Sequence, residues 1–259
     1  MAWPRASTSI RCYLTTSTTA KVTDVAAQHR VTNTDTYAAA YYTANHQDGD
    51  RVALRWYCSL VDRFSQPGRA LDFGCGTGWL MKRLLASRSV DGLEQSEYAL
   101  TVAKKNCPSS RFFADVSQAP SDSYAVITCI HVVEHLPEED LDDVFTQWRR
   151  LLKPGGVVLL VTPDLGGRGE QIRGKKWRGY DDPTHVTLRS HAFWSDMFER
   201  HGFDVLAKGS DGLWDPPYGN WLLDRMRLAS VVAQVLAGRL LIPAGSGESA
   251  VIIARAQAH

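Results

Sequence analysis

Glycines and carboxylates in residues 71–94 have the types and spacing of a site that binds a ribose-containing ligand. Residues 71–78 read Leu-Asp-Phe-Gly-Cys-Gly-Thr-Gly. The apolar stretch before the first glycine predicts a buried strand, residues 79–85 predict the helix after it, and the glycines allow a sharp turn close to a ligand. Glu94 ends the next apolar run, where a β-α-β unit presents a carboxylate to two ribose hydroxyls.

Other glycine-loop motifs fit this stretch less well. A dinucleotide-binding GxGxxG motif needs a third glycine at position 79, which is Trp79, and a P-loop needs a Gly-Lys-Ser/Thr run, which the chain lacks. A plain glycine turn between a strand and a helix would leave Glu94 unexplained. The spacing is GxGxG preceded by the acid Asp72.

Further strand signals follow in order along the chain. Residues 111–115 predict a strand that ends in a carboxylate, and residues 124–130 predict a strand followed by His-Val-Val-Glu-His-Leu-Pro. Residues 151–163 read Leu-Leu-Lys-Pro-Gly-Gly and then an apolar strand, in which proline ends a helix and the glycines supply the turn. Helices at about 190–201 and strands at 203–208 and 249–254 complete an alternating α/β pattern.

Together these motifs resemble the class I S-adenosylmethionine-dependent methyltransferases over roughly residues 35–205. Within that class the chain is most similar to the subgroup of ubiquinone-biosynthesis O-methyltransferases and natural-product methyltransferases. The resemblance implies a seven-stranded, doubly wound Rossmann-like sheet in the order 3-2-1-4-5-7-6, with an N-terminal helical segment. It also implies that S-adenosylmethionine is the cofactor.

The resemblance also assigns the cofactor site to the loops after the strands. Asp72 and the glycine loop would hold the methionine part, Glu94 the ribose, and Asp115 with Val116 the adenine. The N-terminal tyrosines either reach the cofactor or only pack in the core. The predicted cofactor-binding residues are Tyr42, Asp72, Gly74, Gly76, Gly78, Glu94, Gln95, Asp115, Val116 and Ile130.

Two histidines are candidate catalytic bases. Methyl transfer needs a base only when the acceptor carries a proton near neutral pH, and histidine titrates close to that range. His131 directly follows a strand and should face the transferred methyl, while His185 lies on a long connection that can close over the acceptor. The alternatives are a hydrogen-bonded wall residue for His131 and a loop anchor for His185.

Residues 131–135 also have the HxxEH spacing of inverted zinc peptidases. That site needs a long helix, whereas this run leaves a strand and meets Pro137. Some related methyltransferases have a glutamate at the position of His131 and bind a divalent ion there. Magnesium prefers oxygen ligands, so His131 argues against it, and we predict no metal.

The bulk composition describes an ordinary soluble domain. Hydrophobic content is 44%, and the net charge of +1 favours no nucleic-acid partner. The five cysteines form no CxxC pair, which favours a reducing, cytoplasmic compartment. There is no apolar run long enough for stable membrane insertion. Residues 1–23 are rich in serine and threonine and lack acids, which suits a transit peptide, an over-extended start site or, as we expect for residues 1–32, a disordered tail.

Residues 33–259 should form one domain with acceptor-site insertions at 163–189 and 211–248. The first is rich in glycine and basic residues, and the second includes a predicted helix at about 220–237. We expect both on the carboxyl side of the sheet, with apolar walls from Trp177, Tyr180, Trp214 and Tyr218.

The leading hypothesis is methyl transfer to an oxygen or nitrogen of a small biosynthetic molecule. One alternative is an RNA or protein methyltransferase, and another is a catalytically silent cofactor-binding scaffold. Neutral net charge disfavours RNA, and the intact glycine and carboxylate set disfavours the silent scaffold. A homodimer is compatible with the sequence.

Overall fold

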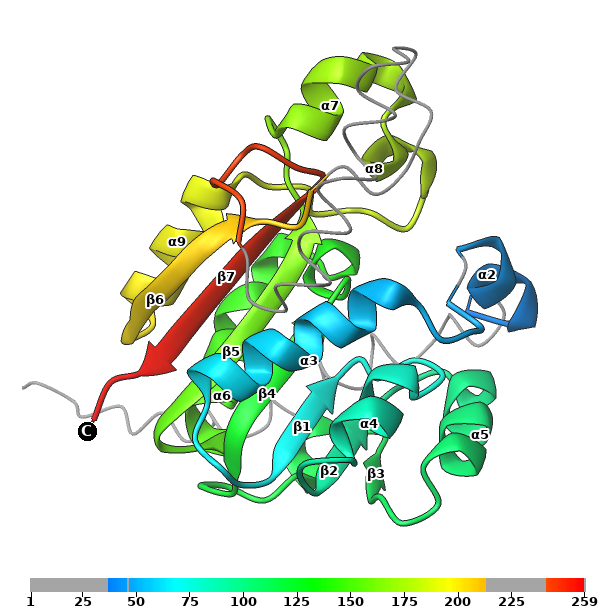
Figure 1. The fold of residues 1–259 in the computed structure, drawn as a ribbon, viewed down its shortest axis with the longest axis vertical. Coiled ribbons are helices and arrows are strands. Elements are labelled where there is room, and N and C mark those ends of the chain that lie inside the picture. Colours follow the sequence, from blue (N-terminus) through cyan, green and yellow to red (C-terminus); the bar gives the residue numbers. More distant parts are fainter. Residues whose placement is uncertain (1–36, 46, 213–240, 259) are drawn as a thin grey trace, which may run out of the picture. The chain divides into compact units, whose positions relative to one another are not determined.

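A mixed seven-stranded sheet forms the centre of the computed structural model, which describes residues 37–45, 47–212 and 241–258 (Figure 1). The strands are β1 (Ala70–Phe73), β2 (Val90–Leu93), β3 (Phe112–Phe113), β4 (Tyr124–Ile130), β5 (Leu152–Pro163), β6 (Phe203–Ser210) and β7 (Ser249–Ala256). Their order is β3-β2-β1-β4-β5-β7-β6, and β7 runs antiparallel to both neighbours. The predicted fold class and strand order are confirmed.

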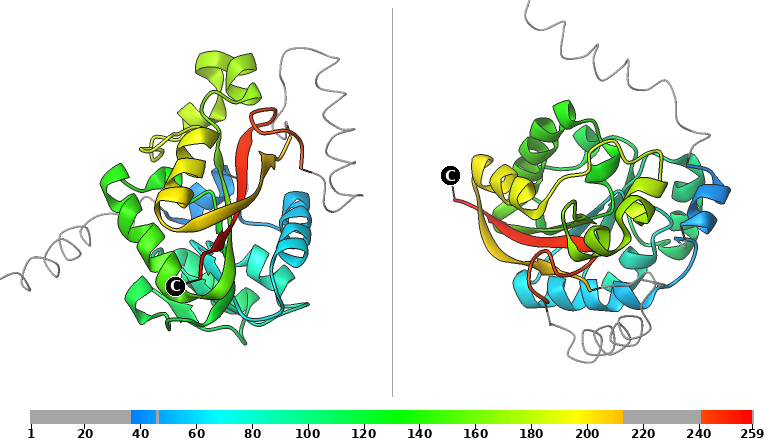
Figure 2. Two further views of the ribbon diagram at one scale, coloured as in Figure 1. Left: turned by 90° about the vertical axis from the view of Figure 1, so that its left-hand side faces the viewer. Right: turned by 90° about the horizontal axis from the view of Figure 1, so that it is seen from above.

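Helices cover both faces of this sheet (Figure 2). The α-helices are α2 (Ala39–Ala44), α3 (Val52–Phe64), α4 (Trp79–Leu84), α5 (Glu97–Asn106), α6 (Leu141–Leu151), α7 (Arg168–Arg173), α8 (Arg178–Asp181) and α9 (His191–Arg200). Short 3₁₀ turns are η1 (Val116–Gln118), η2 (Val133–His135), η3 (Glu138–Asp140) and η4 (Gly174–Lys176). Helices α3, α4 and α5 share one apolar core with the sheet, and α6 and α9 share the other.

The apolar pattern of the sequence explains both cores. In α6, Leu141, Phe145, Trp148 and Leu151 recur at helical spacing and are all buried. Burial of each such side chain contributes about 1.5–3 kcal/mol. The central strands β4 and β5 carry almost continuous buried runs, as expected for strands covered on both faces. The fold therefore holds the carboxyl ends of β1, β2 and β4 side by side.

Several element boundaries differ from the sequence prediction. Strand β3 has two residues instead of the predicted 111–115, because Asp115 instead caps η1 by accepting a hydrogen bond from Ser117 N–H. Strand β5 begins at Leu152, before the predicted turn, with a register irregularity against β4. The connection 163–189, predicted as a loop, contains α7, η4 and α8. The tail 1–32, Trp214, Tyr218 and the helix at 220–237 lie outside the described residues.

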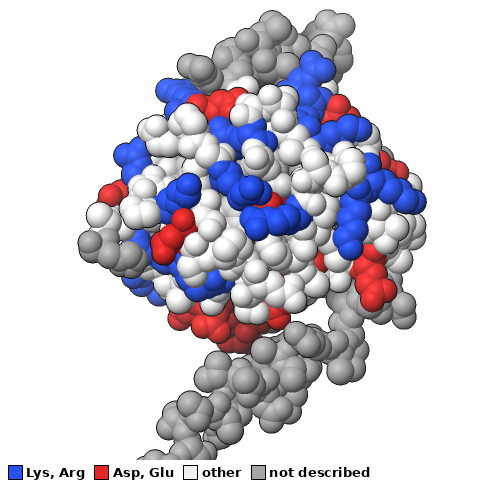
Figure 3. All heavy atoms as spheres, turned by 90° about the horizontal axis from the view of Figure 1, so that it is seen from below, with Lys and Arg blue, Asp and Glu red and all other residues white. Residues whose placement is uncertain are grey.

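The face at the amino ends of the parallel strands carries many Lys and Arg side chains, mixed with acidic ones (Figure 3). Arg69 and Arg111 both donate to the fully buried Asp91 on β2, which also accepts a hydrogen bond from Tyr124. These two arginines therefore stabilise the fold on the side away from the glycine loop. Within the described ranges, no helix combines the length and the apolar character required to cross a membrane.

Candidate functional site

The glycine loop joins β1 to α4 in a backbone conformation that favours glycine. Gly74, Gly76 and Gly78 have φ angles of +74°, +51° and +81°. A Cβ on Gly74 would lie 2.4 Å from Val132 Cγ2, so the residue after His131 packs directly on this loop. A Cβ on Gly76 would have Tyr42 Cε1 as its nearest neighbour, at 3.5 Å. The end of β4 is therefore fixed against the loop that is predicted to hold the cofactor.

Glu94 at the end of β2 braces the same loop. Its Oε2 accepts a hydrogen bond from Gly76 N–H at 2.8 Å, and its Oε1 accepts from Gln95 N–H and Ser96 N–H, each at 2.8 Å. Burial raises the pKa of the Glu94 carboxyl above its ordinary value, against the lowering effect of these three bonds. Each carboxylate oxygen can accept more than one bond, so the side chain is still suited to ribose hydroxyls.

Asp72 is a residue of β1 and its side chain is buried. Its Oδ1 accepts a hydrogen bond from the Thr128 hydroxyl at 2.7 Å, and burial raises its pKa to about 7. A cationic group beside this carboxylate would favour its charged form. The contact with the amino group of the cofactor, which the resemblance implies for Asp72, stays a prediction.

Helix α2 brings Tyr42 to the glycine loop. The ring is 4% exposed and packs at a tilt against Tyr98, with centroids 5.8 Å apart. The segment after α2 is bonded to the loop as well, because Thr77 donates to the Gln47 carbonyl and Trp79 Nε1 donates to the Asp48 carbonyl. Tyr42 therefore lies beside Gly76, and its contact with the cofactor stays a prediction.

The remaining predicted cofactor residues lie at the ends of β2, β3 and β4. Gln95 follows Glu94, Asp115 is the N-cap of η1, Val116 is its first residue, and Ile130 is the last residue of β4. These strand ends lie at one edge of the parallel sheet, where ligands of open α/β folds bind. Glycine turns with φ above zero and the Glu94 carboxylate at the next strand end fit the ribose of an adenosine-containing cofactor.

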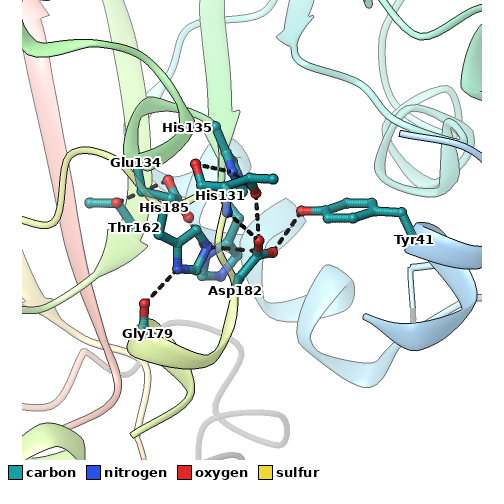
Figure 4. Close-up of polar contacts among 9 residues, drawn as sticks. Tyr41, His131, Glu134, His135, Thr162, Gly179, Asp182 and His185 are labelled. Atoms are coloured by element: carbon teal, nitrogen blue, oxygen red, sulfur yellow. Dashed lines mark hydrogen bonds and ion pairs between the residues drawn. The ribbon is translucent and has the colours of Figure 1, made fainter. Parts of the chain in front are cut away.

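His131 has an unusual backbone conformation for its residue type. Its φ is +56°, in the left-handed region that non-glycine residues rarely adopt, and its N–H donates to the Val161 carbonyl at 2.8 Å. Such conformations cost of order 1–3 kcal/mol and are concentrated at functional sites. Its ring Nδ1 lies 3.0 Å from Glu134 Oε1 (Figure 4).

Glu134, the bonding partner of His131, belongs to η2 and is fully buried. Its Oε2 accepts a hydrogen bond from the Thr162 hydroxyl at 3.0 Å. Burial acts to raise the pKa of the Glu134 carboxyl, but the bond from His131 and the nearby histidines outweigh it and bring the pKa below its ordinary value. Glu134 is therefore an ionised carboxylate, a role that the HxxEH spacing alone did not reveal.

His185 lies close to this pair, on the segment that follows α8. Its Nδ1 is 2.8 Å from the Gly179 carbonyl, and its ring centroid is 4.7 Å from that of His135. The structure thus brings both predicted catalytic histidines to the carboxyl edge of the sheet, around Glu134.

A hydrogen-bonded network connects α2 to the segment that carries His185. The Tyr41 hydroxyl donates to Asp182 Oδ2 at 3.1 Å, and the Thr184 hydroxyl donates to Asp182 Oδ1 at 2.5 Å. His135 Nδ1 lies 2.8 Å from Thr184 Oγ1. Sequence reasoning missed this network, since Tyr41 and Asp182 are 141 residues apart and neither belongs to a recognisable motif.

Glu134, His135 and His185 offer ligand atoms within 4.8 Å of one another, a spacing that can hold a metal ion. In the structure, however, Glu134 is already bonded through both oxygens to His131 and Thr162. Two imidazoles are also poor ligands for magnesium. The expectation that no metal is bound stays a prediction.

Trp177 differs from its predicted role as a wall of the acceptor site. Its side chain is 1% exposed and its Nε1 donates to the Glu248 carboxylate at 2.8 Å. A Cβ on Gly169 would lie within 2.6 Å of the same carboxyl group, so α7 packs tightly against the start of β7. Trp177 therefore anchors the α7–α8 segment to the sheet, whereas Tyr180 is exposed.

Comparison with known proteins agrees with this architecture. A family model described as a methyltransferase domain matches residues 46–208. A ubiquinone biosynthesis O-methyltransferase of Pseudomonas aeruginosa (strain LESB58) is 35% identical over 104 residues, which cover 36% of this chain and 44% of that protein. An uncharacterized methyltransferase of Bacillus mycoides (strain KBAB4) is 29% identical over 150 residues, covering 53% of this chain and 70% of that protein.

Solved structures show the same fold. An S-adenosylmethionine-dependent methyltransferase from Archaeoglobus fulgidus is similar with a TM-score of 0.54 at 16% identity, covering 78% of this chain and 94% of that one. A putative sarcosine dimethylglycine methyltransferase from Galdieria sulphuraria gives a TM-score of 0.58 at 15% identity, covering 86% of this chain and 99% of that one.

The chain belongs to the class I S-adenosylmethionine-dependent methyltransferases. S-adenosylmethionine is accordingly its cofactor, and it is an enzyme of methyl transfer. The match spans less than half of the Pseudomonas protein, so the family is shared while the acceptor is not thereby assigned.

Proposed function

We propose that this enzyme methylates an oxygen or nitrogen of a small biosynthetic molecule and that His131 is the general base. The observation that carries the proposal is the strained His131 backbone at the end of β4, with its ring bonded to a buried carboxylate and its neighbour Val132 packed on the glycine loop. The packing of Val132 on this loop supports a position for the His131 imidazole near the bound cofactor.

Bound S-adenosylmethionine supplies a methyl group on a sulfonium, which is already a good leaving group. The residues of the chain then have to align the acceptor, exclude water and remove one proton. His131 Nε2 would take the acceptor proton while the acceptor lone pair forms its bond to the methyl carbon. Glu94 and the glycine loop would hold the ribose and methionine parts, and His185 would contact the acceptor from the opposite segment.

The contacts around the site favour a small acceptor. Tyr41 on α2 is bonded to Asp182, so the helix beside the glycine loop and the segment that carries His185 meet over the carboxyl edge. A large polymer would have to separate them. The relatives named as ubiquinone biosynthesis O-methyltransferases also support a small biosynthetic acceptor, at partial coverage. We infer that residues 163–189 and 211–248 supply the acceptor-binding surface.

A methyl-transfer screen tests this function. The full chain is incubated with S-adenosylmethionine labelled in the methyl group and with libraries of phenols, carboxylic acids and amines. His131→Asn is the control, since asparagine tolerates a positive φ and lacks the imidazole. The native enzyme should transfer label to a small molecule, and the rate of this transfer should be at least about 100-fold lower with the variant. Label that enters only added RNA or protein would contradict the proposal.

A further inference from the structure

Base catalysis by His131 alone does not explain why the fully buried residue 134 is a glutamate. A buried carboxylate is costly unless its oxygens are bonded, and an apolar side chain at this position would pack at no such cost. Here Oε1 lies 3.0 Å from His131 Nδ1, and Oε2 accepts from Thr162 at 3.0 Å. An ionised carboxylate only accepts hydrogen bonds, so the hydrogen of this contact belongs to Nδ1.

We propose that Glu134 is a positioning residue that holds His131 in the Nδ1–H tautomer and leaves the Nε2 lone pair free for the acceptor proton. This inference rests on the proposed function. In the step itself, the proton leaves the acceptor for Nε2, the acceptor binds the methyl carbon, and the carbon–sulfur bonding pair stays with sulfur. The Nδ1–H remains bonded to Glu134, which stabilises the imidazolium by its charge.

The surroundings of Glu134 keep this geometry fixed. The left-handed φ of His131 turns the chain into η2, so that residues 131 and 134 face each other within one short turn. The Glu134 carbonyl accepts hydrogen bonds from Val186 N–H and Thr187 N–H, which fixes the turn to the segment that carries His185. The His131 side chain is 28% exposed although its partner carboxylate is fully buried. The ring is therefore held on one side and accessible on the other.

Nitrogen-15 NMR of the imidazole rings in the cofactor-free enzyme tests the tautomer directly. The chain has eight histidines, and the signals that disappear in His131→Asn identify residue 131. We expect a protonated Nδ1 and an unprotonated Nε2 for neutral His131. A ring protonated at Nε2 in the native protein overturns the proposal without any variant of Glu134.

Glu134→Gln tests whether the carboxylate sets this tautomer and assists turnover. The amide can donate or accept, so both tautomers of His131 should be populated. With an acceptor from the screen, kcat should fall about 10- to 1,000-fold, while KM and the Kd for S-adenosylmethionine stay within about twofold. The matched control is Glu139→Gln, which removes an exposed charge nearby and should leave both readouts unchanged.

An unchanged tautomer and unchanged kcat in Glu134→Gln would overturn the proposal. It would equally be overturned by a stoichiometric divalent ion that the native enzyme retains and Glu134→Gln loses, because Glu134 would then be a metal ligand. If the screen instead finds no small-molecule acceptor, the proposed function fails. The NMR result needs no acceptor and therefore reports on Glu134 separately.

Discussion

Replacement of Glu94 should weaken cofactor binding and loosen the glycine loop at the same time. The carboxylate accepts three backbone N–H bonds in the ligand-free protein, from Gly76, Gln95 and Ser96, and it is the residue placed to accept from the ribose. Glu94→Ala removes all of these acceptors. Glu94→Gln keeps the shape of the side chain but replaces one carboxylate oxygen by an amide NH₂. That group cannot accept a hydrogen bond from the backbone N–H that faces it.

The two effects have different sizes. Two lost bonds from the ribose hydroxyls to a charged acceptor cost about 2–4 kcal/mol, which raises the Kd for S-adenosylmethionine roughly 30- to 700-fold in the alanine variant. The bond from Gln95 N–H is exposed and those from Gly76 N–H and Ser96 N–H are partly buried, so water can replace part of the lost bonding. We therefore expect the free energy of unfolding without cofactor to fall by only about 1–3 kcal/mol.

Titration calorimetry gives the affinity and urea unfolding gives the stability of the same samples. Glu97→Gln, an exposed charge three residues further on, is the control and should change neither by much. Unchanged affinity with lowered stability in Glu94→Ala would refute the ribose contact and leave Glu94 as a brace of the loop. Unchanged stability would refute the three backbone bonds.

Further expectations concern the buried charge, the α2 contact and metal. Burial raises the pKa of Asp72 to about 7, so from pH 4 to 7 the unfolded chain loses a proton that the folded protein keeps, and stability falls as pH rises. Asp72→Asn should reduce this fall and raise the free energy of unfolding at pH 8, measured in urea, by about 1–3 kcal/mol. Burial also raises the pKa of Asp211 to about 7, so part of the pH dependence should remain in this variant. Tyr41→Phe should speed amide hydrogen exchange in α2, unlike Tyr98→Phe; equal exchange would show that the Asp182 bond does not hold the helix. Dialysis against a chelator should leave methyl transfer unchanged, whereas a loss restored by magnesium would establish a metal requirement.

The fold around the glycine loop could largely be predicted from the sequence, because local rules determine it. The glycines need positive φ, and Glu94 and Asp115 follow strands whose carboxyl ends a parallel sheet brings to one edge. Strand β4 was predicted with its observed bounds, since residues 124–130 are apolar and bounded by turn signals. Glu94 was placed correctly at a strand end, although its three bonds to the backbone were not foreseen.

The acceptor half depends on contacts between distant residues, which no local pattern encodes. Helices α7 and α8 have six and four residues, too short to be stable alone, and their sequence reads as a glycine-rich loop. Tertiary contacts hold this segment instead, such as the bond from Trp177 to Glu248, 71 residues away. For the same reason Trp177 was predicted to be a wall residue although it is an anchor.

One packing contact between the two halves limits how either can change. Val132 Cγ2 occupies the space that a Cβ on Gly74 would need, and His131 precedes Val132 in the chain. Any side chain at position 74 must displace Val132, and the displacement reaches the strained His131 backbone and its bond to Glu134. The glycine at position 74 thus serves the proposed base as well as the cofactor loop. A substitution there should impair cofactor binding and turnover together, because both depend on the same close approach of β1 and β4.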